Sequence, residues 1–126
     1  MLANVVGDDG SDGQRARAEF RGVGDVAAPD LVDVETVAVL RKRWMAGTVT
    51  DQRFAAAVED LGQLDLDRYP ALQVHAPRLQ YELRANVTAY DSAYVALAEE
   101  LGCELLTADR RLASAPGPRC AIRVLR

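Results

Sequence analysis

The stretch from residue 88 to residue 112 constrains the fold most strongly, because it joins the clearest helix of the sequence to an apolar run. Its apolar residues recur every three or four positions: Tyr90, Tyr94, Leu97 and Leu101. This period predicts a helix over 88–101, and Gly102 supplies its left-handed stop. The apolar run over 104–107 then predicts a strand, followed by a short helix over 110–113.

The rest of the sequence alternates further helices with short apolar runs. Helices are predicted over 14–20, over 30–45 and over 50–61, the last with Thr50 as its cap and Gly62 at its end. Pro70 begins a further segment of helical period, which tolerates Pro77 near its start. Strands are predicted over 26–28, 64–67 and 120–125, and 7–13 is a turn cluster. Alternating strands and helices imply an α/β fold with a largely parallel sheet.

Length and charge limit the broad class of protein. A chain of 126 residues, 49% of them hydrophobic, is enough for one domain with a core. Its formal charge of −4 does not by itself indicate a nucleic-acid binder. The positive charge is almost all arginine, gathered at 41–43, at 110–111 and in the tail at 119–126. Arginine suits phosphate through its bidentate fork, although any single cluster is more often a solvated surface.

Cysteine usage and the lack of long apolar runs bear on the compartment. Cys103 and Cys120 lie in apolar surroundings without Cys-x-x-Cys spacing, so we expect them to be reduced core residues of a cytoplasmic protein. No signal peptide is recognisable, and no apolar run approaches the roughly 20 residues that span a bilayer. The sequence therefore predicts a soluble, intracellular protein.

Glu35 is the least ordinary acid of the sequence. It lies in the predicted helix 30–45, where its helical neighbours are apolar: Leu31, Val32, Ala38 and Val39. A carboxylate on an apolar face is costly unless it is paired or binds a metal. Lys42 is too distant for a direct i,i+4 pair, so a functional role for Glu35 stays open.

Asp91 and Asp109 each allow a structural and a functional interpretation. Thr88-x-x-Asp91 resembles a capping box, and Asp109 could cap the helix that begins at Arg110. Alternatively, Asp91 projects from the helix end toward the strand tips, and Asp109 lies at the carboxyl edge of the sheet, where α/β proteins bind ligands. Thr107 would point to the same side as Asp109 and could hold a metal-bound water or a phosphate.

Three segments together resemble PIN-domain ribonucleases, specifically the VapC-type toxins of bacterial toxin–antitoxin pairs. They are Pro29-x-Leu31-x-x-x-Glu35, the helix that opens Thr88-Ala-Tyr-Asp91, and Leu105-Leu-Thr107-Ala-Asp109-Arg-Arg-Leu112. The resemblance implies a single PIN-like domain over 1–126, with three α/β/α layers around a mainly parallel central sheet. It also implies that Glu35, Asp91 and Asp109 are catalytic acids that bind Mg²⁺ or Mn²⁺, with Thr107 assisting.

The sequence departs from the family pattern at its start. Family members begin with an apolar strand ending in an aspartate ligand, whereas residues 1–10 look like the helix that follows that strand. The resemblance therefore implies an N-terminally truncated domain with a strand edge left unpaired. Asp8, Asp9 and Asp12 belong to the turn cluster and are not substitutes. Three acids could still bind Mg²⁺ weakly, so catalysis would suffer more than binding.

The resemblance implies metal-assisted hydrolysis of RNA phosphodiester bonds, in tRNA or another structured RNA with unpaired bases. Five arginines are candidates to hold the RNA backbone: Arg41, Arg43, Arg84, Arg110 and Arg111. The family also implies a homodimer and a VapB-type antitoxin that places a basic side chain among the acids.

Two alternatives to an active nuclease remain. The chain could be a catalytically impaired PIN domain that mainly binds its antitoxin. A receiver- or phosphatase-type protein is a third hypothesis, but Asp65-Leu-Asp67 is followed by Arg-Tyr-Pro rather than by a phosphate-binding turn. His75, the sole histidine, has no partner spacing and is set aside.

Overall fold

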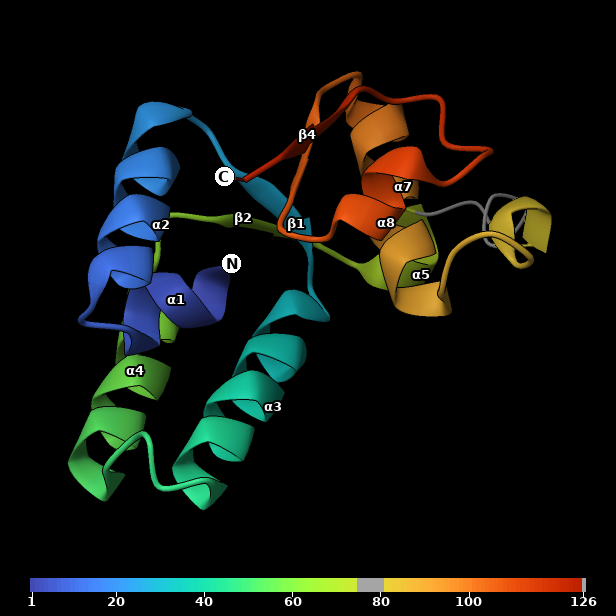
Figure 1. Cartoon of the computed structure of the whole chain (residues 1–126). Helices are drawn as coiled ribbons and strands as arrows, with labels where there is room; N and C mark the ends of the chain where they lie inside the picture. Colours follow the sequence, from blue (N-terminus) through green and yellow to red (C-terminus); the bar gives the residue numbers. More distant parts are fainter. Residues whose placement is uncertain (75–80, 126) are drawn as a thin grey trace. The chain divides into compact units, whose positions relative to one another are not determined.

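Four helices pack together in the part of the chain formed by residues 1–27 and 31–67, which we call unit 1 (Figure 1). The structure is a computed structural model and describes residues 1–74 and 81–125. The helices of unit 1 are α1 (Leu2–Gly7), α2 (Ser11–Gly22), α3 (Val32–Met45) and α4 (Asp51–Gln63). Helix α1 contacts the other three, so it is the centre of this unit.

Close contact between α1 and α3 organises the core of unit 1. Leu40 on α3 and Ala57 on α4 are fully buried. A Cβ on Gly7 would overlap the end of the Leu40 side chain, so any larger residue here would require that side chain to move. The guanidinium of Arg43 then donates to the Ala3 carbonyl at 3.3 Å and to Asn4 Oδ1 at 2.6 Å, which holds α1 onto α3.

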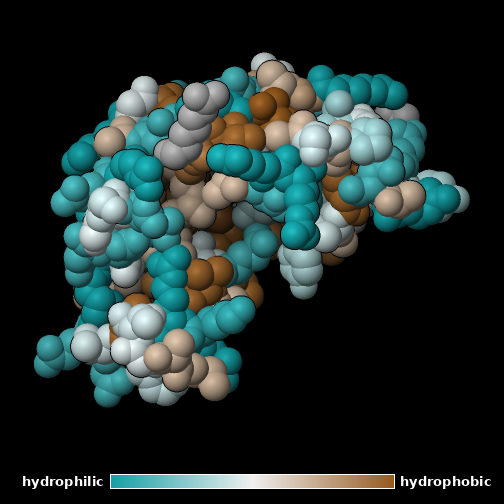
Figure 2. All heavy atoms as spheres, viewed as in Figure 1, coloured by the Kyte–Doolittle hydropathy of each residue, from teal (hydrophilic) through white to brown (hydrophobic). Residues whose placement is uncertain are grey.

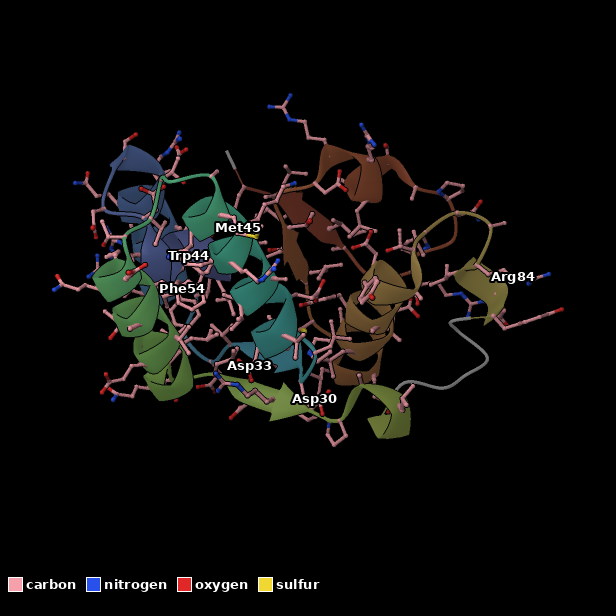
Figure 3. All side chains as sticks on the ribbon, turned by 90° about the horizontal axis from the view of Figure 1, so that it is seen from below. Asp30, Asp33, Trp44, Met45, Phe54 and Arg84 are labelled. Carbon is pink, nitrogen blue, oxygen red and sulfur yellow. The ribbon has the colours of Figure 1, made fainter. Side chains whose placement is uncertain are left out.

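Aromatic side chains close the end of the α3–α4 hairpin, as Figure 3 shows for Trp44 and Phe54. Their ring centroids lie 6.3 Å apart in a tilted arrangement. The indole Nε1 of Trp44 donates to Asp51 Oδ1 at 2.6 Å, which satisfies its polar group while the ring stays 44% exposed. This end of the hairpin is therefore fixed by packing and by one hydrogen bond.

Unit 2, formed by residues 28–30 and 68–126, combines helices with a parallel strand pair. Its elements are α5 (Ala71–Val74), α7 (Ala89–Leu101), β3 (Leu105–Thr107), α8 (Arg110–Ser114) and β4 (Ile122–Val124). Strands β3 and β4 pair in parallel, with Leu105 opposite Ile122 and Thr107 opposite Val124. Leu105 is buried in a cluster that α7 and α8 also supply: Leu83, Val95, Ala98, Leu105 and Leu112.

A second strand pair joins β1 (Ala27–Pro29) to β2 (Asp67–Tyr69). The first residue of each strand belongs to unit 1 and the other two residues belong to unit 2. The amide of Asp67 donates to the Val26 carbonyl, and the amide of Asp30 donates to the Tyr69 carbonyl. The α/β class and the parallel pairing predicted from sequence are confirmed. That the two units form one domain stays a prediction.

Local capping signals placed most helix ends correctly. Thr50 accepts from the Arg53 amide at the start of α4, and Gly102 ends α7 with a φ of 63°. The predicted helix 14–20 is longer, at Ser11–Gly22, and α4 passes the predicted stop at Gly62. The strand predicted at 64–67 is wrong, because α4 continues to Gln63 and pairing begins only at Asp67. Pro77 and His75 lie outside the described residues.

The apolar spacing predicts helix α7 correctly but does not mark its buried face. Tyr90 and Leu101 are 63% and 40% exposed, and the buried face is built from smaller side chains around Ala93 and Val95.

One burial prediction was wrong. Cys103 is exposed and Cys120 half-buried, so neither lies in the core; β3 begins only at Leu105 and leaves Cys103 at the surface.

Hydrophilic side chains cover most of the face seen in Figure 2, and apolar side chains show between them in patches. Among the described residues, none of the helices combines the length and the apolar character needed to cross a membrane.

We expect Gly13→Ala to lower the free energy of unfolding by about 1–3 kcal/mol, the usual range for overpacking. A Cβ at this position would overlap the Asp8 carbonyl oxygen, which accepts from Arg17 Nη1 at 2.7 Å. Urea unfolding followed by circular dichroism measures the change. The matched control is Gly62→Ala, where a Cβ meets no atom within 4 Å, and it should gain roughly 0.5–1 kcal/mol. Equal stability of the two variants would contradict this packing.

Candidate functional site

Thr107 and Asp109 lie together at the carboxyl end of β3. The Asp109 amide donates to Thr107 Oγ1 at 3.0 Å, and Asp109 Oδ1 accepts from the Arg111 amide at 2.8 Å. Asp109 is thus the N-cap of α8, as predicted, and its side chain is exposed. A carboxylate has about four lone-pair sites, so capping one amide leaves capacity for further partners.

Asp91 lies in the first turn of α7 and is half-buried. Its amide donates to Thr88 Oγ1 at 3.1 Å, which confirms the threonine half of the predicted capping box. The backbone rather than the carboxylate makes this bond. Substitution of the carboxylate alone therefore leaves the threonine cap in place.

Glu35 lies on α3 in unit 1 and is half-buried. Its predicted apolar face is only partly present, since Val32 is buried but Val39 is 43% exposed. Burial lowers the pKa of the Met1 α-amino group, the positive charge of Arg43 lowers it further, and the carboxylate of Glu35 opposes both. Glu35 therefore interacts electrostatically with that amine, a relationship that the sequence alone did not reveal.

The three predicted acids are divided between the units, Glu35 in unit 1 and Asp91 and Asp109 in unit 2. Within residues 1–74 and 81–125, no group of three or more His, Cys, Asp or Glu side chains is placed to hold a metal ion. The donor chemistry nevertheless fits a hard cation, because carboxylate and hydroxyl oxygens are the ligands that Mg²⁺ prefers.

The candidate phosphate-binding arginines differ in how they are held. Arg43 binds α1, and Arg84 lies 3.8 Å from the centre of the Tyr81 ring while donating to the Tyr81 carbonyl at 2.6 Å (Figure 3). Arg110 and Arg111 are exposed and directly follow Asp109. They are therefore the arginines best placed to contact a phosphate beside Thr107 and Asp109.

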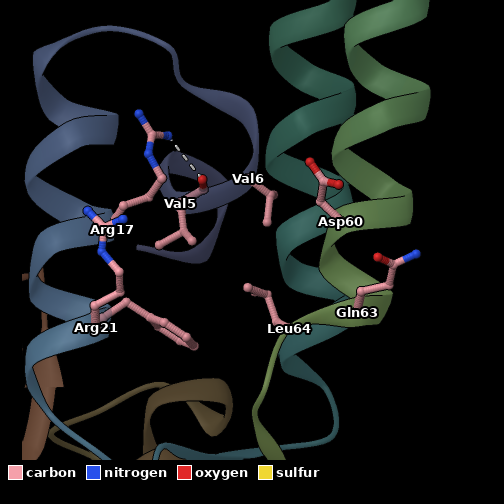
Figure 4. Close-up of a pocket in the computed structure, with 8 residues that line it drawn as sticks. Val5, Val6, Arg17, Arg21, Asp60, Gln63 and Leu64 are labelled. Carbon is pink, nitrogen blue, oxygen red and sulfur yellow. Dashed lines mark hydrogen bonds between the residues drawn. The ribbon is translucent and has the colours of Figure 1, made fainter.

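Unit 1 holds a groove of about 410 Å³ that the sequence did not predict (Figure 4). Helices α1, α2 and α4 and the residue after α4 line it with Val5, Val6, Arg17, Phe20, Arg21, Asp60, Gln63 and Leu64. Arg17 donates to the Val5 carbonyl at 3.1 Å, so its guanidinium helps to hold the wall of the groove. The lining is mainly apolar and contains a single carboxylate, which suits binding better than catalysis.

Comparison with known proteins gives a consistent result. A family model described as PIN domain matches residues 2–118. The chain is 43% identical over 102 residues to Ribonuclease VapC1 of Mycobacterium tuberculosis, covering 79% of this chain and 74% of that protein. It is 40% identical over 100 residues to VapC ribonuclease Mb0985 of Mycobacterium bovis, covering 77% and 75%. Ribonuclease VapC12 of Mycobacterium tuberculosis is 36% identical over 100 residues, covering 79% and 76%.

We expect Asp109→Ala to lower the free energy of unfolding by about 1 kcal/mol, because it removes the N-cap of α8. Asp109→Asn should stay within about 0.5 kcal/mol of the unchanged chain, since asparagine caps as well as aspartate. Urea unfolding of the two variants measures both values. A large loss in Asp109→Asn would show that the negative charge itself stabilises unit 2.

Proposed function

Because the chain belongs to the PIN-domain family and is a VapC-type protein, we propose that it is a metal-dependent endoribonuclease, the toxin of a type II toxin–antitoxin pair. Its substrate is RNA, in tRNA or another structured RNA, and its reaction is phosphodiester hydrolysis. The observation that carries this proposal is the similarity to Ribonuclease VapC1 over 79% of the chain. A cytoplasmic location and a homodimeric assembly belong to the same proposal.

In this proposal Asp91, Asp109 and Glu35 hold a divalent cation, Mg²⁺ or Mn²⁺. The cation, when bound, neutralises charge on the phosphodiester and makes water a better nucleophile at neutral pH. The presence of oxygen donors at all three family positions supports this assignment.

Thr107 and the adjacent arginines supply the remaining chemistry. Thr107 Oγ1 already accepts from the Asp109 amide, so its own hydroxyl proton is available to donate to a phosphate oxygen or a water. The exposed guanidinium groups of Arg110 and Arg111 bind the RNA backbone by bidentate hydrogen bonds. Bases in a single-stranded loop can be splayed out for recognition, which favours such a target over a duplex.

A VapB-type antitoxin is the proposed protein partner. The groove of unit 1 accepts apolar side chains from one segment of it, because Val5, Val6 and Phe20 offer a concave apolar lining. A basic side chain of the antitoxin then pairs with the proposed catalytic carboxylates, as expected for a chain with a net charge of −4.

A second function, antitoxin binding without cleavage, is favoured by one observation. The described residues contain no group of three acids placed to hold a metal. Loss of a ligand affects catalysis more than protein binding, so an impaired nuclease would keep its partner.

We expect the chain to cleave RNA with Mg²⁺ or Mn²⁺ and to lose this activity in EDTA. Asp91→Asn should lower the cleavage rate at least about 100-fold, since a lost ligand forfeits several kcal/mol of transition-state stabilisation. Gel analysis of total RNA and of a fluorescent loop substrate measures both. Glu35→Gln, tested in parallel, decides whether the third acid takes part.

The matched control is Asp65→Asn, an exposed aspartate away from the three motifs, which should cleave at the unchanged rate. Equal unfolding curves of Asp91→Asn and the unchanged chain exclude a folding defect. Absence of cleavage at every metal concentration, with antitoxin binding intact, would reject the nuclease and support the second function.

We expect Phe20→Ala to weaken antitoxin binding about 10-fold or more, as for an aromatic residue at the centre of an interface. Isothermal titration calorimetry with the cognate antitoxin measures the change in Kd. Gln63→Ala, at the rim of the same groove, should change Kd less than about threefold. Equal Kd values for Phe20→Ala and the unchanged chain would place the antitoxin elsewhere.

A further inference from the structure

The two cysteines of the chain lie at the same end of the β3–β4 pair. Leu105 is opposite Ile122 in the parallel register, and Cys103 and Cys120 each precede their strand by two residues. They are far apart in the sequence and share no motif, so only the strand pairing brings them together.

Hydrogen bonds fix the backbone on both sides of this juxtaposition. The Cys103 amide donates to the Ala98 carbonyl at 3.0 Å, and the Leu105 amide donates to the Ala121 carbonyl at 2.9 Å. The Arg119 amide donates to Glu99 Oε1 at 2.6 Å. Cys103 itself is thus hydrogen-bonded to the end of α7, and the two residues that flank Cys120 are hydrogen-bonded to Glu99 and Leu105.

Both cysteines line one open hollow of about 560 Å³ in unit 2. Its other lining residues come from the end of α7 and the starts of the two strand segments: Ala98, Glu99, Gly102, Glu104, Arg119 and Ala121. Both thiols are free, Cys103 exposed and Cys120 half-buried against the apolar cluster of unit 2. The strands that the two cysteines precede are spaced about 4.8 Å apart, and a disulfide needs Cα atoms roughly 4.4–6.8 Å apart.

We propose that Cys103 and Cys120 form a reversible intramolecular disulfide by exchange with a low-molecular-weight disulfide. The Cys103 thiolate attacks one sulfur of the small disulfide, which forms a mixed disulfide and releases one small thiolate. The Cys120 thiolate then attacks the Cys103 sulfur and expels the second small thiolate. Two protein thiols are oxidised, one small disulfide is reduced to two thiols, and the two protein protons pass to these products or to solvent.

The two thiols have different parts in this sequence. Burial raises the pKa of Cys120, and the negative charges of Glu99 and of the Cys103 thiolate raise it further. A thiol with a raised pKa is a poor first nucleophile at neutral pH, whereas Cys103 is exposed to solvent. Cys103 is therefore the attacking residue and Cys120 the resolving residue.

The bridge would close a loop that carries Thr107, Asp109 and all of α8. Such a loop constrains the unfolded chain and ties the start of β4 to the start of β3. The disulfide would therefore stabilise unit 2 under oxidising conditions. Its formation can be measured whether or not the chain cleaves RNA.

Incubation of the full chain in glutathione redox buffers, followed by acid quenching and mass spectrometry, tests the proposal. We expect the intact protein to lose the mass of two hydrogen atoms, and a non-reducing peptide map to join the Cys103 and Cys120 peptides. Cys120→Ser should instead accumulate a glutathione adduct at Cys103, and Cys103→Ser should react much more slowly. Adducts at both cysteines of the unchanged chain, or disulfide-linked dimers through Cys103, would overturn the proposal.

The same incubation in concentrated guanidinium measures how readily the disulfide forms in the unfolded chain, where the fold no longer holds the two thiols near each other. A bridge favoured by the strand register should form with an equilibrium constant about 10-fold or more higher in the native chain than in the denatured one. Equal constants in the two conditions would mean that the register does not bring the thiols together.

Discussion

The parallel pairing of β3 with β4 is the constraint on which unit 2 depends. It buries Leu105 among residues from α7 and α8, and so fixes where each neighbouring segment meets the sheet. One end of β3 then passes through Thr107 to Asp109, where α8 begins. The other end follows Gly102, whose left-handed conformation turns the chain out of α7. Thr107 and Asp109 thus lie at one end of a strand of three residues, and Cys103 lies just before its other end.

The acids proposed for catalysis also lie at helix starts, and the two roles use different atoms. At Asp91 the backbone amide bonds to Thr88, so the helix does not need the carboxylate for that bond. At Asp109 one carboxylate oxygen accepts from Arg111, which orients the side chain at the end of β3. A cap of this kind holds a carboxylate in one direction before any ligand arrives. Such pre-orientation lowers the entropic cost of gathering the ligands of a cation.

Local chemistry made much of the fold predictable, and long-range contact made the rest unpredictable. Thr50, Thr88 and Gly102 act on backbone groups within a few residues, so the sequence places them correctly. Exposure of Tyr90 depends instead on what packs against α7, which its spacing does not encode. The same holds for the coupling of Glu35 to the Met1 amine, because the two residues belong to different helical segments that meet only after folding. Cys103 and Cys120 likewise line one hollow because β3 and β4, which follow them, pair over a long sequence separation.

The two ends of β3 also separate the two proposed activities in space. Cys103 and Thr107 are four residues apart, roughly 13 Å at about 3.3 Å per residue of extended chain. A disulfide at the first position therefore cannot obstruct a phosphate at the second by direct contact. Its influence would reach Thr107 and Asp109 only by stiffening the β3–β4 ladder, in which the Leu125 amide donates to the Thr107 carbonyl at 2.8 Å. Because that bond uses the Thr107 backbone and not its hydroxyl, the side chain stays available for its own chemistry when the ladder is braced.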